Sequence, residues 1–206
     1  DIRARLLPLG GALTKELWRE AFPGETYDNS SLQDVFESMQ RYNPKRLTSF
    51  LKERFSIDSG TLPGWYQTWF AMPWSKIYTL NIDDLELAAA NRFELPRQMR
   101  AISAIEGQPH PEPGEPARQL DTIHLNGIAS DGPDGVTFSH EQFATRLGRQ
   151  EPYYAFLAAE MLSHPVVFVG SPLDEPLFWA HLALRSQRAS AGEMRPKSYL
   201  LSPTLN

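Results

Sequence analysis

The sequence predicts an α/β fold with a mostly parallel sheet flanked by helices. Short apolar runs alternate with helix-like segments along the chain, which is the order that parallel sheets with crossover helices require. The run Val166-Val167-Phe168-Val169 is continuously apolar, as expected of a strand covered on both faces. The 206 residues, 41% of them hydrophobic, are enough to bury the core of one large domain.

Four short runs of apolar or β-branched residues are the predicted strands. They span residues 76–80, 122–125, 165–169 and 198–201. Between and before them, helical patterns fill the chain. The segment 31–70 is all-helical in character, so we expect it to form a helical cap or an insertion.

The predicted helices begin at recognisable capping residues. Ser31 followed by Asp34 starts a helix to about residue 40, and Pro44 starts the next, which runs to about residue 55. Ser139 with Gln142 resembles a capping box for a helix through residue 149. Two further helices are expected at 152–162 and, after the acidic start at 174–176, through about residue 188.

Composition excludes several classes of protein. The formal charge of -5 and the pI near 5.6 give no basic footprint, so direct nucleic-acid binding by this segment is not expected. The chain has no apolar run of 18 residues and no signal-peptide pattern, which predicts a soluble, cytoplasmic protein without a membrane partner. The absence of cysteine excludes a four-cysteine zinc ribbon, and we predict no metal site.

Three short polar stretches follow predicted strands: Asn81-Ile82-Asp83-Asp84, Asn126-Gly127 and Gly170-Ser171. Ligands of an open parallel sheet bind outside the carboxyl ends of its strands, so we expect the three to lie along one edge. The Asn81 amide can donate and accept at once, and glycine lets a ligand approach the backbone. The alternatives remain open: Asp83 or Asp84 can be a helix N-cap, and Gly170-Ser171 a tight turn.

These stretches resemble motifs of one family. Residues 77–86, Ile-Tyr-Thr-Leu-Asn-Ile-Asp-Asp-Leu-Glu, are similar to the Thr-x-Asn-x-Asp segment of the sirtuin superfamily. Residues 167–176 are similar to a later motif of bacterial sirtuin-like (SIR2-like) domains, and residues 122–127 resemble a strand ending in Leu-His-Gly. The resemblance covers residues 76–176, with the three motifs in the family's order.

The resemblance implies an NAD-binding, Rossmann-like domain with a helical small domain. Within it, Asn81 would lie by the nicotinamide ribose and Asp83 would help to hold NAD. Gly127, Gly170 and Ser171 would contact the ribose or phosphate portion.

Two departures from the family follow from the same comparison. The opening phosphate loop has no counterpart, so we expect the domain, residues 1–206, to be incomplete at its N-terminus and to belong to a longer protein. The family's catalytic histidine corresponds to Asn126, and a carboxamide cannot take a proton from a ribose hydroxyl. His124, two residues earlier on the same strand face, is the candidate substitute, with a structural role in the strand as the alternative.

The resemblance implies an NAD-hydrolysing effector domain, an NAD glycohydrolase that cleaves the nicotinamide–ribose bond in bacterial antiphage defence. Its catalytic candidates are Asn81, Asn126 and His124. A sensing or regulatory domain, fused or associated, would activate it, and a homo-oligomer stays open. The alternative, prompted by Asn126, is a catalytically impaired domain that binds NAD or ADP-ribose or serves assembly; a deacylase comes third because the zinc ribbon is absent.

Overall fold

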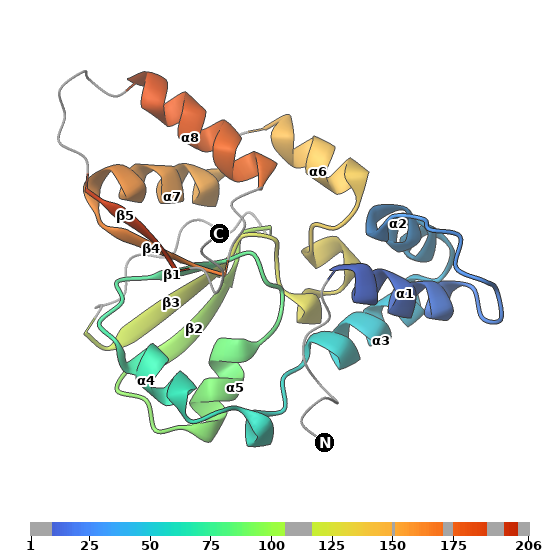
Figure 1. Ribbon diagram of the computed structural model, residues 1–206, viewed down its shortest axis with the longest axis horizontal. Helices are drawn as coiled ribbons and strands as arrows, with labels where there is room; N and C mark the ends of the chain where they lie inside the picture. Colours follow the sequence, from blue (N-terminus) through green and yellow to red (C-terminus); the bar gives the residue numbers. More distant parts are fainter. Residues whose placement is uncertain (1–9, 106–116, 150, 171–174, 189–195, 202–206) are drawn as a thin grey trace. The chain divides into compact units, whose positions relative to one another are not determined.

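The computed structural model describes residues 10–105, 117–149, 151–170, 175–188 and 196–201 (Figure 1). The chain forms two compact units, residues 1–144 and residues 145–206. The predicted α/β class with a parallel, Rossmann-like sheet is confirmed.

The first unit is organised around a three-stranded parallel sheet. It contains β1 (Ile77–Thr79), β2 (Gln98–Ser103) and β3 (Gln119–His124), in the order β1-β3-β2. Thr79, His124 and Ser103 are register partners at the carboxyl ends of the three strands. Because the strands are parallel, these ends meet at one edge of the sheet (Figure 1).

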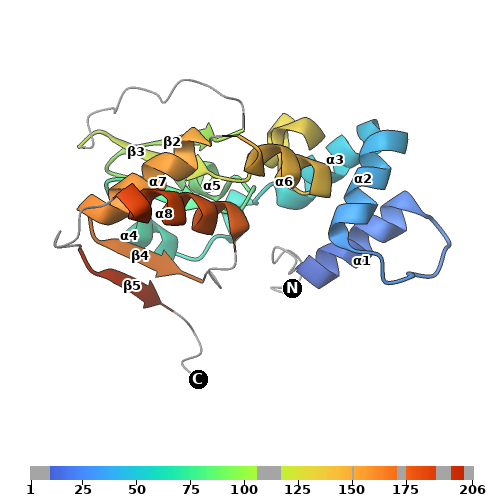
Figure 2. The same cartoon turned by 90° about the horizontal axis from the view of Figure 1, so that it is seen from above.

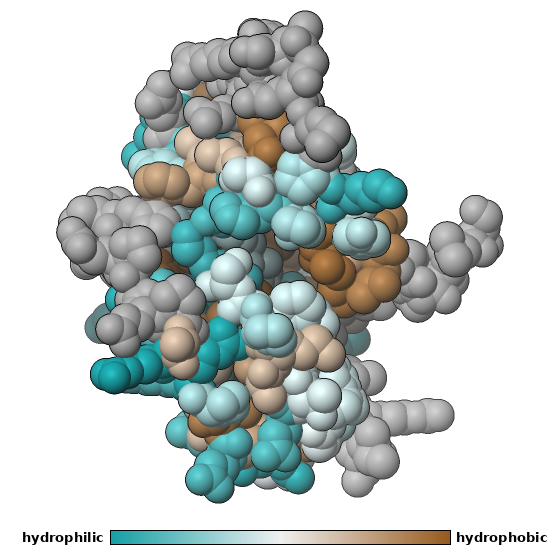
Figure 3. All heavy atoms as spheres, turned by 90° about the vertical axis from the view of Figure 1, so that its left-hand side faces the viewer, coloured by the Kyte–Doolittle hydropathy of each residue, from teal (hydrophilic) through white to brown (hydrophobic). Residues whose placement is uncertain are grey.

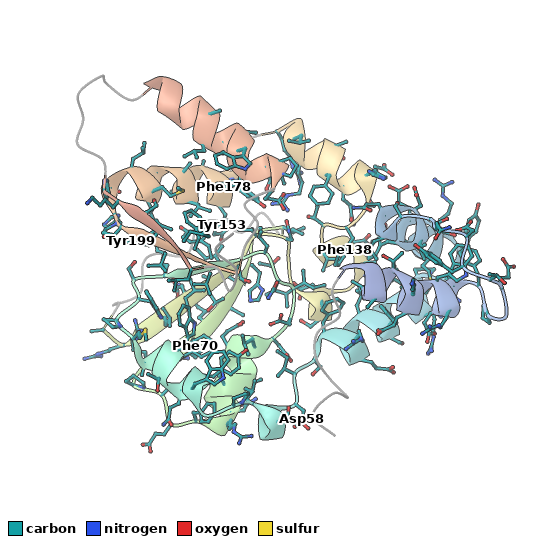
Figure 4. The ribbon with its side chains drawn as sticks, viewed as in Figure 1. Asp58, Phe70, Phe138, Tyr153, Phe178 and Tyr199 are labelled. Atoms are coloured by element: carbon teal, nitrogen blue, oxygen red, sulfur yellow. The ribbon has the colours of Figure 1, made fainter. Side chains whose placement is uncertain are left out.

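One face of this sheet is covered by α4 (Trp65–Ala71) and α5 (Leu85–Arg92). Phe70 of α4 and the α5 alanines pack with Met99 and Leu120 of the sheet (Figure 4). Alternation along β3 puts Leu120, Thr122 and His124 on the same face. The α5 side of the sheet is therefore apolar at the start of β3 and polar at its carboxyl end.

A second core lies among the helices that precede the sheet. The helices are α1 (Gly10–Ala21), α2 (Leu32–Tyr42) and α3 (Pro44–Phe55), which lie side by side in both views (Figures 1 and 2). Ile82, from the turn after β1, is buried in this core together with Ala129 and Val136, and Phe138 packs against it (Figure 4). Burying one such side chain stabilises by about 1.5–3 kcal/mol, so Ile82 anchors the turn that carries the Asn81 and Asp83 motif.

The predicted capping pairs at Ser31 and Ser139 are present, whereas Asp174, the predicted start of a further helix, lies outside the described residues. Ser31 Oγ accepts a hydrogen bond from the Asp34 N–H at 3.1 Å, and the Asp34 carboxylate accepts one from the Ser31 N–H. Ser139 and Gln142 make the corresponding reciprocal pair at the start of α6 (His140–Leu147), with bonds of 3.1 and 2.9 Å. The described part of the first unit also has short 3-10 turns at Ser59–Thr61, Ala129–Asp131 and Pro133–Gly135.

The second unit contains α7 (Pro152–Ser163), α8 (Pro176–Arg188) and a parallel pair of strands, β4 (Val166–Val169) and β5 (Ser198–Leu201). Phe168 of β4 meets Phe178 of α8 edge-on, with ring centroids 6.0 Å apart. Apolar side chains are exposed on the two strands, and apolar surface is visible in the space-filling view (Figure 3).

The structure also corrects the strand assignment. All four predicted strands are present with each bound within three residues of the expected one, but β2 was not predicted. Its sequence, Gln-Met-Arg-Ala-Ile-Ser, has only two strong apolar residues, and they follow neither a continuous nor a strictly alternating pattern. Among the described helices, none combines the length and the apolar character needed to cross a bilayer.

Candidate functional site

Two of the three predicted polar stretches lie at the same edge of the sheet. Thr79 of β1 is paired with His124 of β3, so Asn81 and Asn126 each follow a register partner by two residues. Asn126 is half-buried, and its Nδ2 lies 3.5 Å from the Leu80 carbonyl oxygen, at the long limit of a hydrogen bond. The edge therefore brings together Asn81 and Asn126, two of the predicted catalytic residues.

Asn81 is exposed, and its backbone is held on both sides. Its N–H donates to Thr79 Oγ1 at 3.0 Å, and its carbonyl oxygen accepts from His124 Nδ1 at 2.9 Å. The side-chain carboxamide makes no hydrogen bond to the described part of the chain. A fixed backbone thus presents a free carboxamide, a group that can donate and accept at once.

His124, which contacts the Asn81 carbonyl oxygen, is almost fully buried, with a relative exposure of 1%. Its second ring nitrogen, Nε2, lies 2.9 Å from Glu86 Oε1, and the Glu86 side chain is 3% exposed. Burial lowers the pKa of His124, but the hydrogen bond and charge of Glu86 outweigh it, so the pKa is raised above its ordinary value. The imidazole therefore keeps its proton to higher pH than an exposed histidine does.

Asp83 is also buried, at 2% exposure. Its Oδ1 accepts from the Leu85 N–H at 3.1 Å, and its Oδ2 has no hydrogen-bond partner among the described residues. Burial raises the pKa of Asp83 to about 6, against the lowering effects of the Leu85 N–H and of His124. The Asp83 charge in turn adds to burial in raising the pKa of Tyr66.

The roles of the two adjacent aspartates differ from the simplest expectation. Asp84 occupies the N-cap position of α5, yet its side chain makes no capping bond. It accepts instead from the Ile57 N–H at 2.7 Å and from Ser56 Oγ at 3.3 Å, and so fixes the end of α3. The side chain that meets the start of α5 is Asp83, because its Oδ1 reaches the Leu85 N–H.

Gly127 has a structural reason to be glycine. Its φ is +87°, and a Cβ there would lie 1.9 Å from the Gly135 carbonyl oxygen. Gly127 also forms an isolated antiparallel bridge with Val136. Close backbone packing explains this glycine without a ligand, and its contact with NAD stays a prediction.

The third predicted stretch belongs to the second unit. Gly170 follows β4, is exposed and has φ +64°, with nothing within 4 Å of the position that a Cβ would occupy. Its N–H donates to the Leu201 carbonyl at 3.3 Å. Ser171 lies outside the described residues. The predicted cofactor contacts of Gly170 and Ser171 stay predictions.

A metal ion in a protein is held by a cluster of His, Cys, Asp or Glu side chains. The described residues contain no group of three or more His, Cys, Asp or Glu side chains that could hold a metal ion. The full sequence contains no cysteine.

Sequence reasoning missed Glu86, the partner of His124. A signal was present, because Glu86 and Ala89 are three residues apart and share a face of α5, and Ala89 is apolar and buried. An acid on an apolar face needs a buried partner, and His124 is the only histidine on β3. The pairing itself follows from the register of β3 against β1 and could not be read locally.

Comparison with known families agrees with this geometry. The family model described as a SIR2-like domain matches residues 75–204, which is more than half of the chain. The chain therefore belongs to the SIR2-like domain family. SIR2-like domains bind NAD in general, which indicates an NAD-related function. No curated protein matches the chain.

Proposed function

We propose that this SIR2-like domain is an NAD glycohydrolase, the effector domain of a bacterial antiphage defence protein. One observation carries the proposal: Asn81 presents an exposed carboxamide that makes no hydrogen bond to the described residues, at the carboxyl edge of β1 and β3, where parallel sheets bind ligands. Its backbone is fixed on both sides, as an orienting group requires. Membership of an NAD-binding family supplies the substrate class.

The reaction divides NAD at the nicotinamide–ribose bond. The bond between C1′ and the pyridinium nitrogen breaks, and its electron pair stays on that nitrogen, which leaves as neutral nicotinamide. A water oxygen then bonds to C1′ and releases one proton to solvent, which gives ADP-ribose. The leaving group is neutral on departure, so no general acid has to protonate it.

The residues of the edge would contribute orientation and charge. The Asn81 carboxamide would orient a ribose hydroxyl or the attacking water. Asp83, with a pKa of about 6, carries a negative charge at neutral pH in a water-poor position. A fixed negative charge stabilises a developing oxocarbenium ion more strongly there than in water.

The polar side-chain atoms at this edge that lack a hydrogen-bond partner in the described chain fit NAD better than they fit zinc. Asn81 offers a donor and an acceptor for ribose hydroxyls, and Asp83 Oδ2 is a buried oxygen without a partner in the described chain. A four-thiolate zinc site cannot be built because the sequence has no cysteine. This favours NAD hydrolysis over protein deacylation in a zinc-ribbon enzyme.

Asn126 supports a second candidate function. By the resemblance of residues 122–127, Asn126 corresponds to the family's catalytic histidine, and a carboxamide does not act as a general base near neutral pH. The second candidate is therefore a catalytically impaired domain that binds NAD or ADP-ribose, or that serves assembly. Under either function we propose a cytoplasmic location and a sensing or regulatory domain, fused or associated; whether the protein is a homo-oligomer stays open.

The test is nicotinamide release from NAD by the full-length activated protein, compared with its Asn81→Ala variant. Asn91→Ala is the matched control, because Asn91 is another exposed asparagine, on α5, where alanine suits the helix. We expect release by the wild type and by Asn91→Ala, and a loss of about a hundredfold in Asn81→Ala. Full activity in Asn81→Ala would exclude the role given to Asn81. NAD binding by calorimetry without any release would select the second candidate.

A further inference from the structure

We propose that His124 and Glu86 form a buried positioning pair that fixes the Asn81 turn, so that His124 acts through Asn81 and does not touch NAD. This deepens the proposed function and rests on it for its catalytic consequence. The contacts that define the pair all lie within the first unit, among β3, α5 and the turn after β1.

The proton positions follow from the acceptors that face the ring. The Asn81 carbonyl oxygen can only accept, so His124 Nδ1 must carry a hydrogen. Nε2 faces a Glu86 carboxylate oxygen, so a second hydrogen has to lie between these two atoms, or two lone pairs would oppose each other. An imidazolium, which donates to the Asn81 carbonyl and to the Glu86 carboxylate together, satisfies both contacts.

The charges around the ring favour this form. Glu86 faces the ring from α5, and Asp83 lies close enough, in the turn after β1, for its charge to act on His124. Both are carboxylates, and together with the Asn81 carbonyl they hold the pKa of His124 up against burial. Hydrogen bonds to a charged group contribute about 1.5–3 kcal/mol, more than neutral ones, so the link to Asn81 is strong while the ring is protonated.

Burial decides between a positioning role and a catalytic one. At 1% exposure, with both nitrogens occupied, the His124 ring has no nitrogen free to take a proton from a ribose hydroxyl or a water. What it can do is hold the peptide group between Asn81 and Ile82. That peptide fixes the direction in which the exposed Asn81 carboxamide points.

Two variants separate the pair from general stability. Glu86→Gln keeps the size of the side chain and can donate to Nε2, so the Nδ1 link to Asn81 is kept while the charge is lost. Asp121→Asn is the control, because it weakens a different ion pair of β3. This pair, between Asp121 and Arg100 at 2.8 Å, is partly buried. Asp121 lies three residues from His124 and makes none of the contacts to Asn81.

The first measurement needs no activity. We would titrate the His124 ring nitrogens by NMR in the full chain, together with the Ile82 backbone nitrogen, which belongs to the same peptide group as the Asn81 carbonyl. We expect both signals to titrate together in the wild type. In Glu86→Gln we expect the common midpoint to fall by about one pH unit or more, and in Asp121→Asn to stay unchanged. Independent titration of Ile82, or an unmoved midpoint in Glu86→Gln, would overturn the pair.

The second measurement is the pH profile of NAD hydrolysis. We expect Glu86→Gln to lower kcat about tenfold above the new midpoint, with little change in KM, and Asp121→Asn to leave the profile in place. Equal losses in the two variants with an unmoved profile would reduce the pair to a stabilising contact and refute its positioning role. If the wild type releases no nicotinamide while the NMR titrations behave as expected, the proposed function fails and the pair remains.

Discussion

Replacing Asp83 with asparagine should stabilise the protein at neutral pH. The Asp83 carboxyl is 2% exposed, one of its oxygens has no partner in the described chain, and burial raises its pKa to about 6 from an ordinary 3.8. A raised carboxyl pKa means that the folded state binds the proton more tightly than the unfolded state does. Ionisation of Asp83 therefore destabilises the fold as pH rises from about 4 through 6.

The size of the effect follows from the shift. A difference of about 2 pKa units, at 1.36 kcal/mol per unit, destabilises the wild type by about 3 kcal/mol above pH 7 relative to a neutral side chain. About half of this develops between pH 5 and pH 7.5. Asparagine is neutral throughout and can still accept from the Leu85 N–H, so the free energy of unfolding of Asp83→Asn should lack this fall.

The assay is urea unfolding at pH 5 and pH 7.5, followed by tryptophan fluorescence, since four of the five tryptophans lie in residues 1–144. The quantity to compare is the change with pH of the difference between variant and wild type, because any fixed effect of asparagine cancels. Glu94→Gln, at an exposed carboxylate, is the control and should show no such change. A difference that is the same at both pH values, or that favours the wild type more at pH 7.5, would refute the reasoning.

Two further predictions concern backbone geometry and capping. Gly127→Ala should lower the free energy of unfolding by about 3 kcal/mol or more, because the new Cβ would meet the Gly135 carbonyl oxygen. Gly24→Ala, at the same φ of +87° but with open space around it, should lower it by only about 1 kcal/mol. Equal losses for the two variants in urea unfolding would show that the contact is unimportant. Ser139→Ala should lose about 1 kcal/mol because the Gln142 N–H loses its cap, and hydrogen exchange in the first turn of α6 should rise; unchanged exchange would contradict it.

The sequence predicted most of what depends on local pattern. The capping pairs at Ser31 and Ser139 were readable because their partners lie three residues away. The strand β4 was readable from its continuous apolar run, but the expectation that it is covered on both faces was wrong: Val167 and Val169 are exposed, and the strand pairs with β5 in a two-stranded sheet. β2 was not readable, because its strand conformation comes from pairing along β3 and not from its own composition.

The candidate site was predicted only in part, for the same reason. Placing Asn81 and Asn126 at one edge required only the rule that parallel strands end together. The depth of Asp83 and the partner of His124 required the register between β1 and β3 and the docking of α5, which are tertiary facts. A sequence pattern gives the face on which a side chain lies, but it does not give how deeply that side chain is buried.

Buried charge by itself does not mark the site. Arg146 and Glu151 of the second unit are also buried, at 3% and 5% side-chain exposure, but they pair with each other at 2.8 Å and Arg146 stacks over Tyr154. In the described part of residues 1–144, Asp83 Oδ2 and Thr122 Oγ1 are buried oxygens without a hydrogen-bond partner, and Asp83 belongs to the turn that carries Asn81. An unmatched carboxylate oxygen destabilises the fold, and destabilising groups persist where function requires them. The Asp83→Asn variant should therefore be more stable and less able to hydrolyse NAD, a pairing of effects that a purely structural Asp83 would not produce.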